Sequence, residues 1–342
     1  MHYQSIIMIY SIEQLTDKVN QALDALAYNY KVENLYLPIK YTLDNGGKRI
    51  RPVLMMMAYN MYRDDVERIL PNALAMEVYH NFTLLHDDVM DKAMMRRGKP
   101  CVHVKWDENT AILSGDTMLA MAYQLMTENA AFIQEASAGE VAAYFNAMAT
   151  FNEATIGVCE GQQFDMDFES MDDVSEAQYM EMIRLKTSLL LSKSLKIGAQ
   201  LALADGNDAM LLHEFGEKIG LAFQLQDDLL DVYGDPAVFG KAIGGDITSN
   251  KKTFMLIKTL EMADTQSREE LEEWISKPEF DKAAKIKAVV AIYDKVGIKE
   301  VCQKKIEELF AQGMDALNKV RVEEQKKAML YDFANRLLKR KS

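Results

Sequence analysis

Apolar residues recur along this chain at the spacing of a helix, and no stretch shows the alternation that marks a half-buried strand. Residues 12–29 carry apolar side chains three or four positions apart, at Leu15, Val19, Leu23 and Leu26. Residues 71–89 begin with a proline, which suits a first helical turn, and stay rich in apolar residues. Further helices are expected at about 110–128, 136–158, 176–203 and 208–232. The pattern therefore predicts an all-α protein.

The middle of the chain is expected to form the centre of one helical bundle. Residues 112–125 and 188–204 are apolar on nearly every side, as buried helices are. No proline occurs between Pro100 and Pro236, so no proline breaks the helices there. Because the chain shows no repeat, no Gly/Ser linker and no low-complexity segment, we expect a single domain over residues 1–342. Loops are expected where the pattern is weakest, at residues 45–47, 96–100 and 234–246.

Composition narrows the class of protein. The 342 residues are 49% hydrophobic, which suffices for a large core, and 52 acidic against 39 basic side chains give a net charge of −13. Such a charge repels nucleic acid and anionic membranes, so neither is an expected partner. No apolar run approaches the ~20 residues that span a bilayer, and the start lacks the basic leader of a signal peptide, so no stable membrane insertion is expected. Three scattered cysteines suit a reducing, cytoplasmic location and form no zinc motif.

Two clusters of aspartates carry the candidate chemistry. Asp87 and Asp91 are four residues apart, so they share one face of a helix, and Asp88 lies beside them. The same spacing recurs, again at the end of an apolar helix, in Asp227, Asp228 and Asp231. One such cluster alone is equally well explained as a solvated acidic helix end. Two clusters without histidine or thiolate favour Mg²⁺, which binds one or two carboxylates and takes further ligands from phosphates.

Other metal sites fit the sequence less well. An EF-hand is excluded, because neither aspartate segment has the loop glycine or the closing glutamate of that motif. A di-iron bundle needs the spacing Glu-x-x-His twice. Glu77 and His80 supply it once, and no other histidine has a glutamate three residues before it. A di-iron site is therefore disfavoured.

Basic residues are concentrated near these clusters in an otherwise acidic protein. One group follows a Gly-Gly loop and consists of Lys48, Arg49 and Arg51. Glycine lets a backbone approach a ligand closely, and lysine and arginine hold phosphate oxygens, although the group alone is also explained as an ordinary turn. Arg96 and Arg97 follow the first aspartate cluster, and Lys186 lies inside an apolar helix, where its charge needs an anion or solvent. Metal ions holding one diphosphate and a basic loop holding a second suit ionisation of a diphosphate ester, with a hydrocarbon chain in the apolar interior.

Taken together, these segments resemble the motifs of the trans-type isoprenyl diphosphate synthases. The motifs run in the family's order from residue 46 to residue 251, as GGKRIRP, HNFTLLHDDVMD, RRGKP, EGQQFD, KT, FQLQDD and GDITSNK. The resemblance implies a bundle of ten or more helices around a central substrate cavity, and a homodimer. It implies a short-chain prenyltransferase that joins isopentenyl diphosphate head to tail to an allylic diphosphate, giving geranylgeranyl or farnesyl diphosphate. It also implies Mg²⁺ as cofactor, with three ions expected and Mn²⁺ as a substitute.

The resemblance also assigns roles to residues that match the family's motifs. Catalysis is expected to depend on Asp87, Asp88, Asp91, Lys186, Thr187, Gln224 and Asp227. The Mg²⁺ ligands would be Asp87, Asp91, Asp227 and Asp231. Isopentenyl diphosphate would bind Lys48, Arg49, His80 and Arg97. The allylic diphosphate would bind Arg96, Lys186, Thr187, Gln224, Lys241 and Lys251. Cys101 departs from the pattern, because a threonine is common at its position.

Two related activities are kept as alternatives. A class I terpene cyclase shares the aspartate-rich helix, but its second motif differs from Asp227–Asp231, and it has no need of the loop at Gly46–Arg49. A non-catalytic subunit of a heteromeric synthase would fit a chain that had lost its aspartates, whereas this one keeps both clusters.

Product length is expected to depend on the helix that precedes the first aspartates. Counting back from Asp87, Thr83 lies one turn deeper, Phe82 beside it, and Tyr79 one turn below Phe82. A growing chain would pass Thr83 and meet the Phe82 ring, a pattern that resembles geranylgeranyl synthases. Tyr79 would form a second barrier that shortens the product to farnesyl, so C20 is placed only slightly ahead of C15. The alternative is that both aromatic rings are ordinary core residues.

Overall fold

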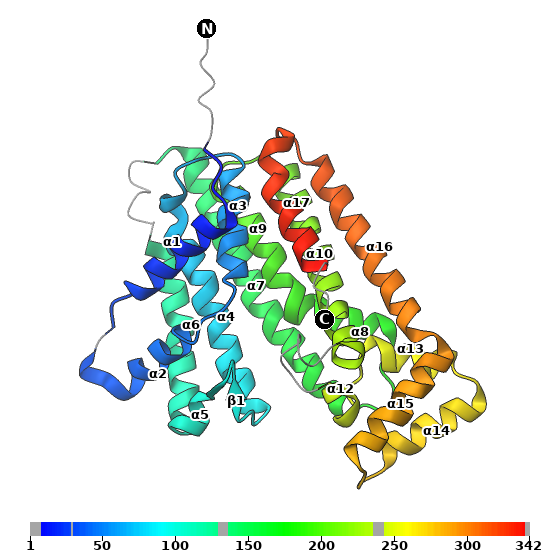
Figure 1. Cartoon of the computed structure of the whole chain (residues 1–342). Helices are drawn as coiled ribbons and strands as arrows, with labels where there is room; N and C mark the ends of the chain where they lie inside the picture. The colour runs from blue at the N-terminus through cyan, green and yellow to red at the C-terminus, as the bar shows by residue number, and fades with distance from the viewer. Residues whose placement is uncertain (1–7, 29, 129–135, 235–242, 339–342) are drawn as a thin grey trace. The chain divides into compact units, whose positions relative to one another are not determined.

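A computed structural model describes residues 8–28, 30–128, 136–234 and 243–338, and helices dominate it (Figure 1). The longer helices are α1 (Ile12–Asp24), α2 (Glu33–Leu43), α3 (Ile50–Asn60), α4 (Leu70–Met90), α6 (Glu108–Thr127), α7 (Ala138–Ser170), α8 (Glu176–Ile183), α9 (Leu189–Leu201), α10 (Gly206–Tyr233), α13 (Phe254–Met262), α14 (Thr265–Ser276), α15 (Lys282–Val296), α16 (Ile298–Lys319) and α17 (Glu324–Leu338). Short elements are η1 (Tyr30–Val32), η2 (Val66–Ile69), α5 (Val102–Lys105), the π-helix η4 (Arg184–Ser188) and α12 (Gly245–Thr248). The predicted all-α bundle of ten or more helices is confirmed.

Local sequence signals explain where several helices begin. Ser11 caps α1 in a capping box with Gln14, which satisfies backbone donors at both ends of the pair. The predicted apolar face of α1 is buried at Leu15, Val19 and Leu23. A second capping box, between Ser175 and Gln178, starts α8. By contrast, α7 runs to Ser170, beyond the predicted end near residue 158, so the EGQQFD motif is helical.

Contacts within the chain divide it into two compact units. The first unit comprises residues 1–151, 194–210 and 321–329, and the second comprises residues 152–193, 211–320 and 330–342. The first aspartate cluster lies in the first unit and the second aspartate cluster in the second. That the whole chain folds as one domain stays a prediction.

In the first unit, α4 packs along α6 and against α3, and nearly all of its residues from Asn72 to Phe82 are buried. Glycines allow close approach at two crossings. A Cβ on Gly115 of α6 would lie 2.2 Å from the His86 ring on α4, and one on Gly198 of α9 would lie 2.1 Å from the Met55 carbonyl oxygen on α3. These contacts fix α4, whose last turn carries the first aspartates.

In the second unit, one apolar cluster joins α8, α10 and α13–α16, with Tyr179, Leu225, Leu271, Tyr293 and Cys302 among its members. A Cβ on Gly220 of α10 would lie 2.5 Å from the Ser188 hydroxyl in η4. The close crossing holds η4 beside the part of α10 that leads to the second aspartates.

The β structure within the described residues is a hairpin of β1 (Met95–Arg96) and β2 (Lys99–Pro100), with Arg96 opposite Lys99. It replaces the loop predicted at residues 96–100. Gly98 and Arg97 both adopt positive φ, 76° and 52°, to make the tight turn. No helix among the described residues has the length and apolar character needed to cross a bilayer.

Candidate active site

The first aspartate site lies at the end of α4, where Asp88 is buried and Asp91 is exposed. Arg96 donates to both carboxylate oxygens of Asp88. Its Nε lies 2.8 Å from Oδ1 and 2.9 Å from Oδ2, and its Nη2 lies 2.7 Å from Oδ1. Its Nη2 also lies 3.7 Å from Asp87. Asp88 therefore holds Arg96, while Asp87 and Asp91 present their carboxylates from one face of the helix.

Cys101 supports the same pair from below the hairpin. Burial, together with a hydrogen bond from the thiol to Asp88, raises the pKa of Cys101 to about 12. The thiol therefore stays protonated and donates to Asp88, as the hydroxyl of a threonine would. The departure from the family pattern at this position keeps a donor in place.

Arg49, one of the residues expected to bind isopentenyl diphosphate, is buried and fully engaged within the protein. Its guanidinium donates to Glu77 at 2.7 Å, to the Leu43 carbonyl at 2.9 Å and to Asn20 at 3.0 Å. The residue has a left-handed backbone, with φ 48°, directly before α3. These contacts tie the start of α3 to α4, whereas Lys48 beside it is exposed.

Arg51, which the sequence argument left without a role, faces His80 with 3.0 Å between Nη1 and Nε2. Its Nε is buried and has no hydrogen-bond partner among the described residues. Burial lowers the pKa of Arg51 to about 10. Burial also lowers the pKa of His80 well below its usual value, and the charges of Arg51, Arg97, Arg96 and Arg49 lower it further. A neutral His80 therefore sits in a field of four arginines that suits an anion.

Arg97 completes this basic cluster, which we define as Lys48, Arg51, His80 and Arg97. Its Nη1 donates to the carbonyl of Gly46. Gly47 has a φ of 144°, which residues other than glycine rarely adopt, so glycine is needed where the Arg97 guanidinium crosses the loop. A small pocket opens beside the cluster, lined among others by Asn45, Asn81, Asp88, Arg96 and Arg97. Buried Asn45 Oδ1 is without a partner among the described residues.

The second aspartate site lies near the end of α10. Asp228 is buried and accepts from the Tyr179 hydroxyl and, at 3.0 Å, from Gln224 Nε2. Asp231 accepts the backbone N–H of Asp246 at 3.0 Å. Burial raises the pKa of Asp228, and burial with the charge of Asp228 raises the pKa of Asp246 to about 7. The Lys251 ammonium opposes both rises, so its positive charge acts on this site.

Lys186 and Thr187 lie in η4, a π-helical turn of the kind that often marks a functional position. Lys186 Nζ lies 2.6 Å from Asp165, the last residue of EGQQFD, and Thr187 donates to Gln224 Oε1 at 3.1 Å. Thr187, Gln224 and Asp228 therefore form one directed chain of hydrogen bonds. A Cβ on Gly161 would lie 2.4 Å from Lys186 N, which explains the glycine in this motif.

The remaining candidates differ in what the structure describes. Lys251 is exposed, and its backbone N–H donates to Asp246 O at 2.9 Å. Lys241 lies outside the described residues. Sequence reasoning missed Asp165, although its place at the end of a quoted motif was a usable signal.

The donor set tests whether a metal ion fits. Each cluster offers carboxylate oxygens from one helix face, and Mg²⁺ prefers such ligands. Within the described ranges, no three or more histidine, cysteine, aspartate or glutamate side chains converge as a ready-made cage. Taken by itself, each cluster fits a hard ion that takes one or two of its carboxylates and further oxygens from diphosphate.

An aromatic wall lies below the first aspartates, as the helix geometry predicts. Tyr79 and Phe82 are buried with ring centroids 5.5 Å apart. Tyr79 also contacts Phe151 of α7 at 5.8 Å, and Phe151 contacts Tyr123 of α6 at 5.1 Å. Thr83 is half-buried and donates to the His80 carbonyl at 2.8 Å. Phe82 and three further rings, from three helices in all, therefore form one aromatic cluster.

Comparisons with known proteins agree on one family. A family model described as polyprenyl synthetase matches residues 32–293. The chain is 38% identical over 254 residues to a geranylgeranyl diphosphate synthase of Methanosarcina mazei, covering 74% of this chain and 76% of that protein. It is 33% identical over 346 residues to a geranylfarnesyl diphosphate synthase of Natronomonas pharaonis, covering 96% and 97%. A crystal structure of a geranylgeranyl pyrophosphate synthase matches with a TM-score of 0.89 and 38% identity, covering 97% of this chain and 100% of the other.

Proposed function

This chain belongs to the polyprenyl synthetase family and is a short-chain prenyltransferase, and we propose that it joins isopentenyl diphosphate head to tail to an allylic diphosphate. The observation that carries the proposal is the Arg51–His80 pair, where Arg51 donates through Nη1 to a neutral imidazole and its buried Nε–H has no partner among the described residues. A diphosphate would satisfy that donor and the surrounding arginines without a metal ion. The basic cluster is therefore proposed to bind isopentenyl diphosphate, and Arg49 to hold the loop that carries it.

The allylic diphosphate is proposed to bind at the aspartate sites, through Mg²⁺ and through Arg96, Lys186, Lys241 and Lys251. Asp87, Asp91, Asp227 and Asp231 would hold the ions, three in number, and Mn²⁺ would substitute. When bound, the metal neutralises the negative charge that develops on the leaving diphosphate. Asp88 and Asp228 are proposed to position these groups, because both are buried and hold their neighbours in place.

The residues of the second unit are proposed to stabilise the allylic cation. Thr187 and Gln224 are linked at 3.1 Å and would direct oxygen dipoles toward it. The isopentenyl double bond then supplies the electron pair for the new C–C bond, and a proton leaves the adjacent carbon. Released pyrophosphate is the proposed base, since burial and the nearby arginines lower the pKa of His80 and make it a weak base, and its Nε2 already accepts from Arg51.

The product is proposed to be C20, slightly ahead of C15. Phe82 is proposed to be the ring that a growing chain meets; Tyr79 contacts the Phe82 ring, and Phe151 contacts Tyr79. The related proteins described above have names for C20 and C25 products, which are compatible with a wall that differs between relatives.

A homodimer in the cytoplasm is also proposed. In the first unit, Leu113 of α6 and Phe145 of α7 are 58% and 60% exposed, and in the second unit Ile156 of α7 is 61% exposed. Large apolar side chains on exposed helix faces suit a partner subunit. All three cysteines are free, and the exposed thiol of Cys159 suits a reducing compartment.

The decisive test supplies isopentenyl diphosphate with dimethylallyl, geranyl or farnesyl diphosphate and Mg²⁺, and then sizes the products. We expect a linear allylic diphosphate, mainly C20, and no product when EDTA removes the metal. A cyclic hydrocarbon formed from the allylic diphosphate alone would instead show a terpene cyclase. Turnover only after addition of a second protein would show a subunit of a heteromeric enzyme.

A further inference from the structure

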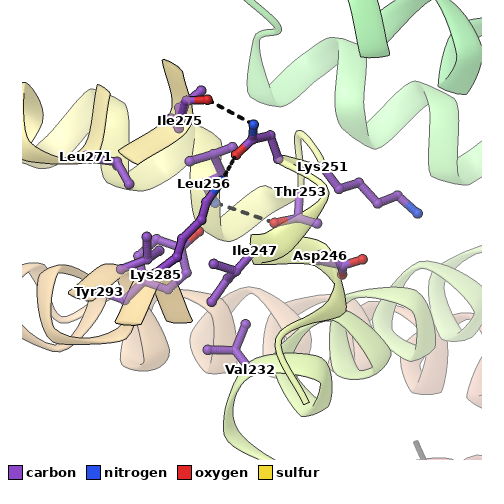
Figure 2. Close-up of a pocket in the computed structure, with 12 residues that line it drawn as sticks. Val232, Asp246, Ile247, Lys251, Thr253, Leu256, Leu271, Ile275, Lys285 and Tyr293 are labelled. Carbon is purple, nitrogen blue, oxygen red and sulfur yellow. Dashed lines mark hydrogen bonds between the residues drawn. The ribbon is translucent and has the colours of Figure 1, made fainter. Parts of the chain in front are cut away.

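A buried lysine outside the motifs above fixes the loop that carries Lys251. Lys285, in the first turns of α15, is 1% exposed, and its ammonium donates to Asn250 Oδ1 at 2.6 Å. The same amide donates through Nδ2 to the carbonyl of Ile275 at 3.0 Å, near the end of α14. Figure 2 shows these bonds beside Lys285 and Ile275, in the pocket that Asp246 and Lys251 also line. One amide therefore ties the loop to two helices.

The environment of Lys285 indicates that its ammonium serves this bond. Its other contact is the ring of Phe280, whose centroid lies 4.1 Å from Nζ. No carboxylate among the described residues forms an ion pair with it, and burial lowers the pKa of Lys285. A buried ammonium is unfavourable unless its donors are satisfied, and an apolar side chain of the same length would avoid that cost. An apolar side chain at this position could not donate a hydrogen bond to Asn250, whereas Lys285 does.

The backbone at Asn250 explains why the bond matters for the loop. Asn250 has a φ of 55°, in the left-handed region that asparagine tolerates better than most residues and that glycine adopts freely. The turn reverses the chain between Asp246, whose N–H donates to Asp231, and Lys251, whose N–H donates to the Asp246 carbonyl. The conformation of Asn250 therefore determines where the next residue, Lys251, projects.

We propose that Lys285 is a positioning residue for the allylic diphosphate site: it holds Asn250 in its left-handed conformation, which directs Lys251 toward the second aspartate site. Lys285 touches no substrate, and it acts only through Asn250. The inference rests on the proposed function, because it takes Lys251 as a ligand of the allylic diphosphate.

A kinetic double-mutant cycle tests the consequence. Lys285→Met should raise the KM for the allylic diphosphate about 10-fold and leave the KM for isopentenyl diphosphate within about 2-fold, because the basic cluster lies in the other unit. Asn250→Ala should do the same, and the double variant should be no worse than Asn250→Ala alone. Lys287→Met removes the same charge from an exposed position on α15 and should change neither constant. Additive losses, or equal rises in both KM values, would overturn the proposal.

Hydrogen exchange tests the tie itself without any catalytic activity. Amides of residues 244–253 should exchange about 10-fold faster in Lys285→Met and Asn250→Ala than in the wild type, with no change in Lys287→Met. Should Lys285→Met not fold, Asn250→Ala removes the same hydrogen bond and disfavours the left-handed turn, and an unchanged allylic KM in it contradicts the proposal. If the wild type makes no product, the proposed function is wrong. Hydrogen exchange would still test whether the bond between Lys285 and Asn250 stabilises the loop. An active wild type with unaltered kinetics in the variants overturns the positioning role alone.

Discussion

The two aspartate sites differ in what surrounds their buried carboxylate. Asp88 meets the guanidinium of Arg96 at 2.7 to 2.9 Å, whereas Asp228 meets a phenol and a primary amide. A guanidinium compensates a negative charge, but neutral donors only partly replace the water that burial removes. Burial accordingly raises the pKa of Asp228.

The difference teaches that equal spacing in the sequence does not give equal electrostatics. In the first site, the positive charge of Arg96 compensates the negative charge of Asp88. Asp87 and Asp91 lie beside this ion pair. The second site depends on cations that arrive with the ligand or on Lys251, whose charge opposes the rise in the pKa of Asp228. We therefore expect the second site to respond more strongly to the loss of a neutral neighbour.

The largest effects are expected where the two sites are alike. Asp87→Ala and Asp227→Ala should each lower kcat by at least ~100-fold, about 2.7 kcal/mol of transition-state stabilisation, because each removes a proposed metal ligand. Steady-state assays at saturating Mg²⁺ check this, with exposed Asp315→Ala as the control. Full activity in either aspartate variant, or in EDTA, would remove the metal assignment from that site.

A second large difference is expected between neighbouring arginines of the first unit. Arg51→Met should raise the KM for isopentenyl diphosphate about 30-fold with little loss of stability, because it removes a proposed diphosphate ligand. Arg49→Met should lower the free energy of unfolding by about 3–5 kcal/mol, because it leaves Glu77 buried without its partner. Substrate titrations and urea unfolding of both variants separate the roles. The proposal fails if Arg49→Met unfolds like the wild type and Arg51→Met keeps a normal KM.

These two arginines also show which features of the site could be predicted from the sequence and which could not. Periodicity and the repeated aspartate spacing were enough to predict the helical fold and both aspartate clusters. Arg49 and Arg51, however, are two residues apart in one basic segment. They differ in the residue of α4 that each contacts: Arg49 contacts Glu77, and Arg51 contacts His80. That pairing depends on the packing of α3 against α4, which no local signal encodes.

Helix ends show the same limit. The predicted helix ending near residue 158 continues through EGQQFD to Ser170, and Gly161 lies inside α7 at a close contact with Lys186. In sequence, a glycine after a helical run is typical of a helix end. Its actual role is to let two backbones approach, and only the three-dimensional partner reveals this.

A moderate effect is expected from removing one neutral or weak donor at each site. Tyr179→Phe should lower kcat/KM about 10-fold, while Cys101→Ala should lower it by less than about 3-fold, since Asp88 keeps Arg96. The Tyr179 hydroxyl lowers the pKa of Asp228 against the effect of burial, so its loss raises that pKa further. A higher pKa protonates the carboxylate at higher pH, so the deficit of Tyr179→Phe should grow as pH falls. Rate profiles between pH 6 and 9 check this, and equal, pH-independent losses in both variants would break the comparison of the two sites.

The smallest change in rate is expected at the aromatic wall of the first unit, where the product changes instead. Phe82→Ala should lengthen the product by one or more C5 units, and adding Tyr79→Ala should lengthen it further, because the two ring centroids lie 5.5 Å apart along the proposed path. Turnover should stay within about 3-fold, although loss of a buried ring lowers the free energy of unfolding by about 3–5 kcal/mol. Phe215→Ala, at a fully buried ring of the second unit, should lose similar stability without changing product length. Chromatography of the dephosphorylated products measures the distribution. If the active double variant makes the same products as the wild type, Phe82 and Tyr79 are ordinary core residues and another wall sets the length.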